Sequence, residues 1–270
     1  MTASRDDELP RMTGAAPPPA AGIVVAAFDF DGTLTHGGSV WPFLVAVRGR
    51  RQVVTAAVAL SGQLARAAVF GGHHVDEAKE ALFRRTLGGL PADEVAAMAD
   101  TFGLAHYRRR GRSDVRERLE WHRVQGHRLV IVSASPDCYV NAVGRELGVD
   151  AVLATRLAVG PDGRLTGNYQ GRNCRGAEKI ARVRRWMKEQ TSTNGSAAAV
   201  ADVLWAYGNS DGDRLLLGGA DIGVDVGRLG RFGALRRFRR LSDLGAAVTS
   251  SGGSGDTSGG ERRERRWRHR

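Results

Sequence analysis

A short apolar run that ends in two aspartates constrains the fold of this chain more than any other feature. The run covers residues 23–28, and Asp29 and Asp31 follow it directly in the stretch FDFDGT. An uninterrupted apolar segment of this length predicts a strand that is buried on both faces. Two carboxylates within three residues repel each other unless a cation or a proton lies between them. We therefore expect a buried strand whose carboxyl end carries a site for positive charge.

The bulk composition predicts a globular domain with a packed core. The chain has 270 residues, of which 42% are hydrophobic, and this length suits one α/β domain with an insertion. Its two cysteines, Cys138 and Cys174, are too few for a disulfide framework and favour a reducing, cytoplasmic setting. The first residues lack a basic segment followed by an apolar one, so no signal peptide is expected.

The positive net charge of +11 is concentrated towards the C-terminus. Residues 228–240 contain six arginines and no acid, and residues 261–270 contain six arginines and two glutamates. The first interpretation is a solvated basic tail, and the alternative is contact with an anionic membrane surface or nucleic acid. No specific nucleic-acid partner is predicted. Only three of the 40 basic side chains are lysines, Lys79, Lys179 and Lys188, and an ammonium is a compact charge where a guanidinium is a planar fork.

Periodicity divides the chain into one strand, a long helical region and a mixed region. Helical patterns cover residues 53–70, 75–86, 92–107 and 113–125. Further strands are expected at residues 128–132, 151–159, 164–169, 203–207 and 221–226, and further helices at 136–147, 177–189 and 214–217. Strands that alternate with helices predict an α/β fold built on a doubly wound parallel sheet.

The same pattern predicts the domain organisation. Residues 22–38 and 119–246 are expected to form the core, and residues 39–118 a helical insertion. Residues 1–21 are rich in proline and alanine, and residues 247–270 join a Gly/Ser-rich linker to the basic end. Both terminal segments are expected to be disordered or flexible, because such sequences bury little apolar surface.

Polar side chains follow three of the expected strands at their carboxyl ends. Asp29 and Asp31 follow the first strand, Ser133 ends the second, and Asn209 and Asp213 follow a later one. Ligands of doubly wound sheets bind beyond the carboxyl ends of the strands, so these side chains are expected to converge. Their oxygen atoms are of the kind that Mg²⁺ prefers.

Each of these signals has a plainer interpretation when it is taken alone. An aspartate in DFDGT can cap a turn, Ser133 can cap a helix, and Lys179 can be a solvated helix residue. Their order and shared position favour a site for a phosphoryl group, which a cation, a lysine and a hydroxyl together can hold. Asp29 is then the expected nucleophile, and Asp31 the group that protonates the leaving oxygen.

Together the four segments resemble the motifs of the haloacid dehalogenase (HAD) superfamily. They are DFDGT at residues 29–33, VSAS around Ser133, GAEK ending at Lys179, and GNSDGD at residues 208–213. With about 90 residues between the first motif and the second strand, the chain looks most like subfamily IB, with a phosphoserine-phosphatase-like core. The resemblance implies a Rossmannoid core with a helical C1 cap, and a Mg²⁺-dependent phosphatase that forms an aspartyl-phosphate.

The resemblance also implies a role for each matching residue. Asp29 matches the nucleophile and a Mg²⁺ ligand, and Asp31 matches the general acid and base, whose backbone carbonyl also binds the metal. Thr33 would orient Asp31. Ser133 would hold a phosphoryl oxygen, and Lys179 would bind phosphate and steady Asp29.

The last motif departs from the family pattern. Asn209 stands where the family usually has an aspartate that binds Mg²⁺ directly, while Asp213 matches the distal acid near the metal. An amide oxygen can coordinate the ion but carries no charge, so weaker Mg²⁺ binding is expected. Asn209 is the feature that favours the alternative of a catalytically weak binding or regulatory protein, and a phosphotransferase is a further alternative.

The expected substrate is a small phosphorylated metabolite or a lipid phosphate. Residues 32–75 contain no acid, whereas the resemblance implies a glutamate there in enzymes that act on phosphoserine. Residues 55–70 are strongly apolar, which predicts a buried helix or, alternatively, a helix lying at a membrane interface. The protein is expected to be cytoplasmic, with membrane association as the alternative.

Overall fold

The computed structural model describes residues 23–193, 202–227, 235 and 237–244. The predictions of a disordered segment at 1–21 and of a flexible basic tail at 247–270 lie outside these residues, as does most of the basic stretch 228–240. In the described part of the chain, six strands form one sheet in the order β3-β2-β1-β6-β7-β8. Every pair of neighbouring strands in it is parallel.

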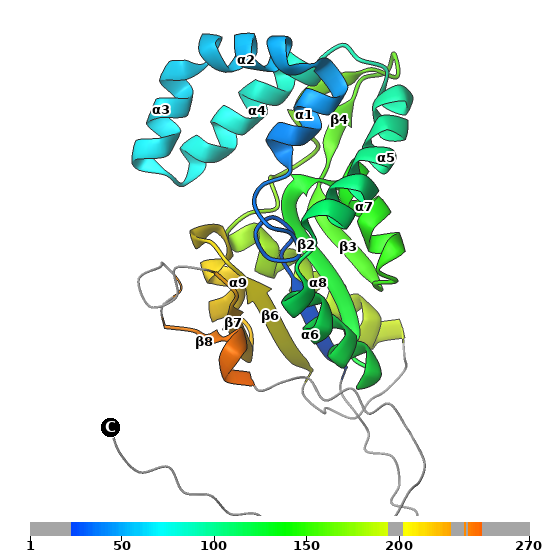
Figure 1. The fold of residues 1–270 in the computed structure, drawn as a ribbon. Coiled ribbons are helices and arrows are strands. Elements are labelled where there is room, and N and C mark those ends of the chain that lie inside the picture. The colour runs from blue at the N-terminus through cyan, green and yellow to red at the C-terminus, as the bar shows by residue number, and fades with distance from the viewer. Residues whose placement is uncertain (1–22, 194–201, 228–234, 236, 245–270) are drawn as a thin grey trace, which may run out of the picture.

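The predicted α/β fold with a parallel sheet is confirmed (Figure 1). The strands of the sheet are β1 (Val24–Phe28), β2 (Arg128–Pro136), β3 (Ala151–Thr155), β6 (Val203–Gly208), β7 (Ile222–Asp225) and β8 (Arg239–Arg240). The helices between β1 and β2 are α1 (Val40–Arg48), α2 (Arg50–Ala59), α3 (Ser61–Phe70), α4 (His73–Leu87), α5 (Ala92–Arg110) and α6 (Ser113–Val124). The later helices are α7 (Asp137–Glu146), α8 (Ala177–Thr193) and α9 (Arg214–Gly218).

Strand β1 is buried on both faces, as its unbroken apolar sequence predicts. Val25 and Ala27 belong to the apolar core formed with α8 and α9. Ala26 and Phe28 belong to the core on the other face, formed with α6 and α7. Successive side chains of a strand point to opposite faces, so a strand covered by helices on both sides has no position for a polar residue. The carboxylates therefore begin where the strand ends.

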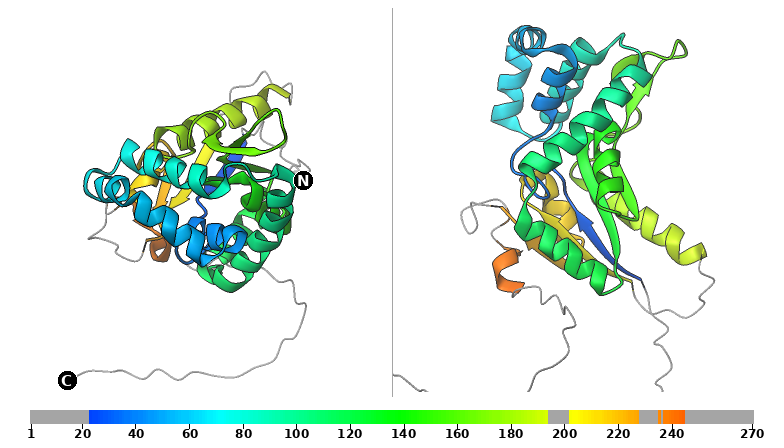
Figure 2. Two further views of the ribbon diagram at one scale, coloured as in Figure 1. Left: turned by 90° about the horizontal axis from the view of Figure 1, so that it is seen from above. Right: turned by 45° about the vertical axis from the view of Figure 1, so that its right-hand side comes forward.

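Helices α1 to α4 gather beyond the carboxyl ends of the strands (Figures 1 and 2). Their buried residues, such as Phe43 and Phe83, continue the apolar core of the α6 and α7 face. Helix α5 packs along α7, and a hairpin of β4 (Leu157–Val159) and β5 (Leu165–Tyr169) packs against α4. The division between insertion and core predicted after residue 118 falls within α6, a helix that contacts β2.

Two local predictions are wrong, and one strand was not predicted. The single helix expected over residues 53–70 is two helices, α2 and α3, bent by 71° at a break next to Ser61 and Gly62, which are poor helix formers. The strand expected over residues 151–159 is divided at Arg156, where the chain leaves the parallel sheet for the hairpin. Strand β8 was not expected, because two arginines carry no strand pattern.

The apolar segment 55–70 is not a buried helix. Val58, Val69 and Phe70 are 67%, 75% and 70% exposed. Helix α3 buries Ala67 and leaves most of its surface to solvent. Among the described residues, no single helix is long and apolar enough to cross a membrane, and α2 with α3 meets that test only as a bent pair.

Candidate active site

The first motif forms a tight loop directly after β1. The N–H of Asp29 donates to the carbonyl of Tyr207 at 2.9 Å, which continues the pairing of β1 with β6. Gly32 has φ of 82°, in the left-handed region that favours glycine. A Cβ at Gly32 would also lie 2.2 Å from Nδ2 of Asn209. Only glycine therefore allows the loop to pass this close to the last motif.

Lys179 lies between two buried carboxylates. Its Nζ is 2.5 Å from Oδ1 of Asp29 and 2.6 Å from Oδ1 of Asp213. All three side chains are buried. Lys179 comes from the start of α8, and Asp213 comes from the short 3-10 turn η1 (Asp211–Asp213) that follows β6. Three predicted site residues from distant parts of the sequence thus meet at the carboxyl edge of the sheet.

The two carboxylates that contact Lys179 have different surroundings. Oδ2 of Asp213 accepts hydrogen bonds from Oγ of Ser210 at 2.7 Å and from the N–H groups of Ser210 and Asn209 at 3.1 and 3.2 Å. Burial opposes ionisation of Asp213, but Lys179 and these donors hold its pKa below the usual range. Burial and the charge of Asp213 raise the pKa of Asp29 to about 7, with Lys179 opposing them. Asp213 is thus the more acidic of the two carboxylates that pair with the lysine.

Thr33 contacts Asp29 and not Asp31. Its hydroxyl lies 2.9 Å from Oδ2 of Asp29 and 3.2 Å from Oδ1 of Asn209, and it can donate to either. The expectation that Thr33 orients Asp31 is therefore wrong, because the turn after β1 brings the threonine back towards Asp29. The same contact places the amide oxygen of Asn209 close to the first motif.

Asp31 is held instead by Ser135, which the sequence did not single out. Oγ of Ser135 donates to Oδ2 of Asp31 at 2.6 Å, and the N–H of Ser135 donates to Oγ of Ser133 at 3.0 Å. Ser133 and Ser135 stand two residues apart at the end of β2, a spacing that places both side chains on one face of a strand. The signal was present in the motif VSAS, where both serines occur.

The site carries more negative than positive charge. Asp29 and Asp213 contact Lys179, Asp31 lies close enough to Asp29 for its charge to act on it, and Oδ1 of Asp31 is a buried oxygen without a hydrogen-bond partner. A buried carboxylate oxygen without a donor or a cation is costly. With the amide oxygen of Asn209 nearby, the available ligand atoms are oxygens. The group of side chains therefore fits a small divalent cation such as Mg²⁺.

Arg112, near the end of the helical insertion, forms hydrogen bonds to the loop that follows β1. Its Nη1 donates to the carbonyl of Gly32 at 3.1 Å and to that of Val226 at 2.7 Å. Its Nη2 lies 2.5 Å from Oδ2 of Asp114, so the guanidinium is also paired. Nothing in the sequence distinguishes this arginine from the many others, because its role depends on carbonyl groups that only the fold brings together.

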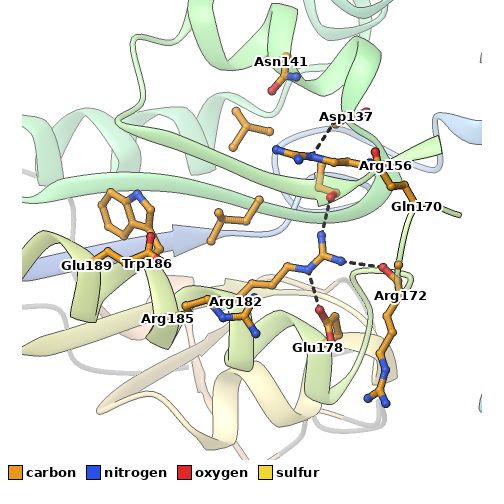
Figure 3. A pocket seen from close by; sticks show the side chains of 14 residues that line it. Asp137, Asn141, Arg156, Gln170, Arg172, Glu178, Arg182, Arg185, Trp186 and Glu189 are labelled. Carbon is orange, nitrogen blue, oxygen red and sulfur yellow. Dashed lines mark hydrogen bonds and ion pairs between the residues drawn. The ribbon is translucent and has the colours of Figure 1, made fainter. Parts of the chain in front are cut away.

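A separate cavity of about 450 Å³ lies beside the edge strand β3 (Figure 3). Arg182 donates to Glu178 at 2.8 Å, and Arg156 lies 3.7 Å from Asp137. The cavity thus contains acids as well as arginines. None of its lining residues is a predicted site residue.

Another group with metal-ligand chemistry stands at the start of α4. The ligand atoms of His73, His74 and Glu77 lie within 4.8 Å of one another. His74 and Glu77 share a cavity of about 310 Å³ with Arg66 and Arg84, whose charges oppose a cation. The carboxylates around Lys179 are the better cation site.

Comparison with known proteins agrees with this arrangement. The family model of haloacid dehalogenase-like hydrolases matches residues 26–218. Protein CicA of Caulobacter vibrioides is 33% identical over 198 residues, which cover 73% of this chain and 83% of CicA.

Two solved structures share the fold. A protein of unknown function from Bordetella pertussis Tohama I aligns with a TM-score of 0.66 and 21% identity, over 82% of this chain and 98% of that one. A phosphoserine phosphatase with a phospho-aspartyl intermediate analogue aligns with a TM-score of 0.54 and 18% identity, over 83% of this chain and 98% of that one. The family match, the shared fold and the converging motifs lead to one conclusion: the chain belongs to the haloacid dehalogenase-like hydrolase family.

Proposed function

We propose that the protein is a Mg²⁺-dependent phosphatase that hydrolyses phosphomonoesters through an aspartyl-phosphate intermediate. The observation that supports this most is the buried Lys179 between Asp29 and Asp213, with a further carboxylate, Asp31, close to Asp29. A nucleophile, a phosphate-binding cation and a proton donor are what phosphate transfer to a carboxylate requires. The phospho-aspartyl analogue in the phosphoserine phosphatase of like fold supports the same chemistry.

The proposed reaction has two steps. In the first, an oxygen of Asp29 forms a bond to phosphorus, the bond from phosphorus to the leaving oxygen breaks, and Asp31 gives that oxygen a proton. In the second, a water oxygen attacks phosphorus, Asp31 takes a proton from the water, and the acyl-phosphate bond breaks. Inorganic phosphate leaves, and both aspartates return to their starting states. Lys179 favours the ionised form of Asp29 before the attack and again when the acyl-phosphate bond breaks.

The two serines and Thr33 would prepare these groups. Ser133 accepts the N–H of Ser135, so its own hydroxyl proton is available for a phosphoryl oxygen. Ser135 would hold Asp31 in the orientation needed for proton transfer, and Thr33 would hold Asp29 for attack.

We assign Mg²⁺ to the side-chain oxygens of Asp29 and Asn209 and to the backbone carbonyl of Asp31. The bound ion would neutralise part of the charge on the phosphoryl group. Both oxygens of Asp213 already accept hydrogen bonds, so its role would be to hold Lys179 and not to bind the ion. Asn209 supplies no charge, so Mg²⁺ binding would be weaker than with an aspartate there. The alternative of a catalytically weak protein rests on this residue.

The substrate would be a small phosphorylated metabolite or a lipid phosphate, selected by a cap that comprises α1 to α5. Exposed Val58, Val69 and Phe70 on α2 and α3, with no acid in residues 32–75, suit an anionic membrane surface. The basic C-terminal region would add to that attraction. The protein would then be cytoplasmic and partly membrane-associated.

Release of phosphate from an aryl phosphate, with and without Mg²⁺, tests the proposal. We expect Mg²⁺-dependent turnover that Asp29→Asn abolishes. Equal turnover by wild type and Asp29→Asn would refute the assignment of Asp29 as the nucleophile. If the wild type is inactive and Asn209→Asp restores activity, the alternative of a catalytically weak protein is correct. Sedimentation with phosphatidylglycerol vesicles, compared with phosphatidylcholine vesicles, tests the membrane part.

A further inference from the structure

Helix α4 docks on the rest of the chain through one polar face. Oε1 of Glu80 accepts a hydrogen bond from the N–H of Tyr169 at 2.8 Å. Oδ1 of Asp76 accepts one from Nδ2 of Asn173 at 2.6 Å. Lys79 lies on the same face and donates to Oδ1 of Asn173 at 3.0 Å. These contacts join the cap to β5 and to the loop before α8.

Lys79 also reaches residues 133–135, called here the serine loop. Its Nζ donates to the carbonyl of Ala134 at 2.8 Å. That carbonyl belongs to the same peptide unit as the N–H of Ser135, which donates to Oγ of Ser133. The hydroxyl of Ser135 in turn holds Asp31. Because a peptide unit is planar and stiff, a hydrogen bond at one end orients the donor at the other. The hydrogen bond from Lys79 therefore helps to fix the positions of the Ser133 and Ser135 hydroxyls.

The ammonium of Lys79 is also electrostatically connected to the site. Burial lowers the pKa of Lys79 to about 8. The charges of Asp76 and Asp31 oppose this effect, and those of Arg175 and Lys179 add to it. Asp31 and Lys179 belong to the site itself, so the amine lies close enough to respond to its charge.

A lysine suits this position better than the arginine that the chain uses almost everywhere else. The contacts are single carbonyl-type oxygens on two separate segments, Ala134 and Asn173. One ammonium nitrogen carries three donors that can turn towards such separate acceptors, whereas the fork of a guanidinium matches two parallel acceptors on one group.

We propose that Lys79 is a positioning residue that sets the serine loop for phosphate transfer when the cap is docked. This inference rests on the proposed phosphatase function, since the loop it prepares is the one that would hold the phosphoryl group. Lys79 acts through the peptide between Ala134 and Ser135, and not by contact with the reacting atoms. With α4 displaced, the loop loses this hydrogen bond and Asp31 loses its aligned partner.

The test compares Lys79→Ala and Lys79→Met with two matched controls. Asp76→Asn alters the same docking network through Asn173 without touching the serine loop, and Lys188→Met removes an exposed lysine of α8. We expect both Lys79 variants to lower kcat for an aryl phosphate about 10- to 100-fold, because displacements near 1 Å at reacting groups cost about 100-fold. Both controls should stay within about threefold of wild type, by the same reasoning. Propylammonium should restore Lys79→Ala, and propanol should not, since the missing group is a charged donor.

Binding of inorganic phosphate, measured by calorimetry, separates this inference from the proposed function. If the wild type binds phosphate but hydrolyses no ester, the proposed function fails, and at least tenfold weaker binding by Lys79→Ala would still support the role of Lys79. Phosphate binding and turnover within twofold of wild type in both Lys79 variants would overturn the inference. Failure of propylammonium to restore Lys79→Ala would also overturn it, because a charged donor would then not be what the serine loop lacks. Absence of phosphate binding to the wild type would overturn both.

Discussion

Replacement of Ser135 by alanine should slow hydrolysis by an amount that depends on the leaving group. The hydroxyl of Ser135 donates to Oδ2 of Asp31 at 2.6 Å, and Oδ1 of Asp31 has no hydrogen-bond partner. The substitution therefore leaves the proposed general acid without the side-chain hydrogen bond that orients it. Hydrogen bonds to a charged group contribute about 1.5–3 kcal/mol, which corresponds to a factor of about 10 to 150 in rate.

The chemistry of the leaving group decides how much of this loss is seen. A poor leaving group, such as the alkoxide of an alkyl phosphate, needs a proton in the transition state, whereas nitrophenolate does not. We expect Ser135→Ala to lower kcat/KM for an alkyl phosphate by a factor within the range of about 10 to 150. For nitrophenyl phosphate, kcat/KM should fall by less than about threefold. KM should change little for either substrate, because the serine contacts Asp31 and not the phosphoryl group.

Thr33→Val is the matched comparison. The hydroxyl of Thr33 contacts the nucleophile Asp29, so its loss should slow both substrates by the same factor. Steady-state rates on the two substrates, for wild type and both variants, give the result. An equal loss on both substrates for Ser135→Ala would refute the reasoning, since Ser135 would then not act through proton donation by Asp31.

Three further predictions concern charge. Asn209→Asp should tighten Mg²⁺ binding about tenfold or more, because it adds a charged ligand, and calorimetry will show no change if Asn209 lies outside the metal site. Lys179→Met should lower the free energy of unfolding by about 3–5 kcal/mol, because it leaves buried carboxylates unpaired, and Asp29→Asn in the same chain should restore part of it in urea titrations. Burial, with the charges of His127 and Arg118, lowers the pKa of His122 to about 3, below its unfolded value of about 6.5. The contribution of His122 to the free energy of unfolding is therefore fully present above pH 6.5, and about 2 kcal/mol of it is lost at pH 5. Urea titrations at pH 7 and pH 5 should show this loss in wild type and not in His122→Gln.

The parts of the site that the sequence predicted are those with a local chemical signature. Asp29 and Asp31 stand out because an apolar strand ends in two acids, and the position of Asp213 follows from a second strand end. Lys179 stands out by its rarity as a residue type and by its place at the start of a helix. Parallel strands bring such positions to one edge whatever the details of the loops.

The parts that were missed depend on how loops turn. Thr33 was expected at Asp31 and Ser135 was not expected at the site, because the turn after β1 brings residue 33 to Asp29, while β2 continues past Ser133 and carries Ser135 to Asp31. Apolar content alone also failed to show that α2 and α3 stay exposed, because a helix-like pattern does not reveal whether another element covers it. Arg112 could not be found at all, since its acceptors are main-chain carbonyls.

Two residues of this site, Asn209 and Lys79, shift its charge in the same direction. The three aspartates and Lys179 together carry about two negative charges when ionised, and an aspartate at position 209 would add a third. Such charge attracts Mg²⁺ but repels a phosphate dianion, and in a buried site this repulsion is weakly screened. Asn209 withholds one negative charge, and Lys79 brings a positive charge to the serine loop as the cap docks. In the proposed phosphatase, weaker metal binding and stronger attraction for the dianion would both follow from Asn209, and Asn209→Asp should tighten Mg²⁺ binding while it raises KM for the phosphate ester.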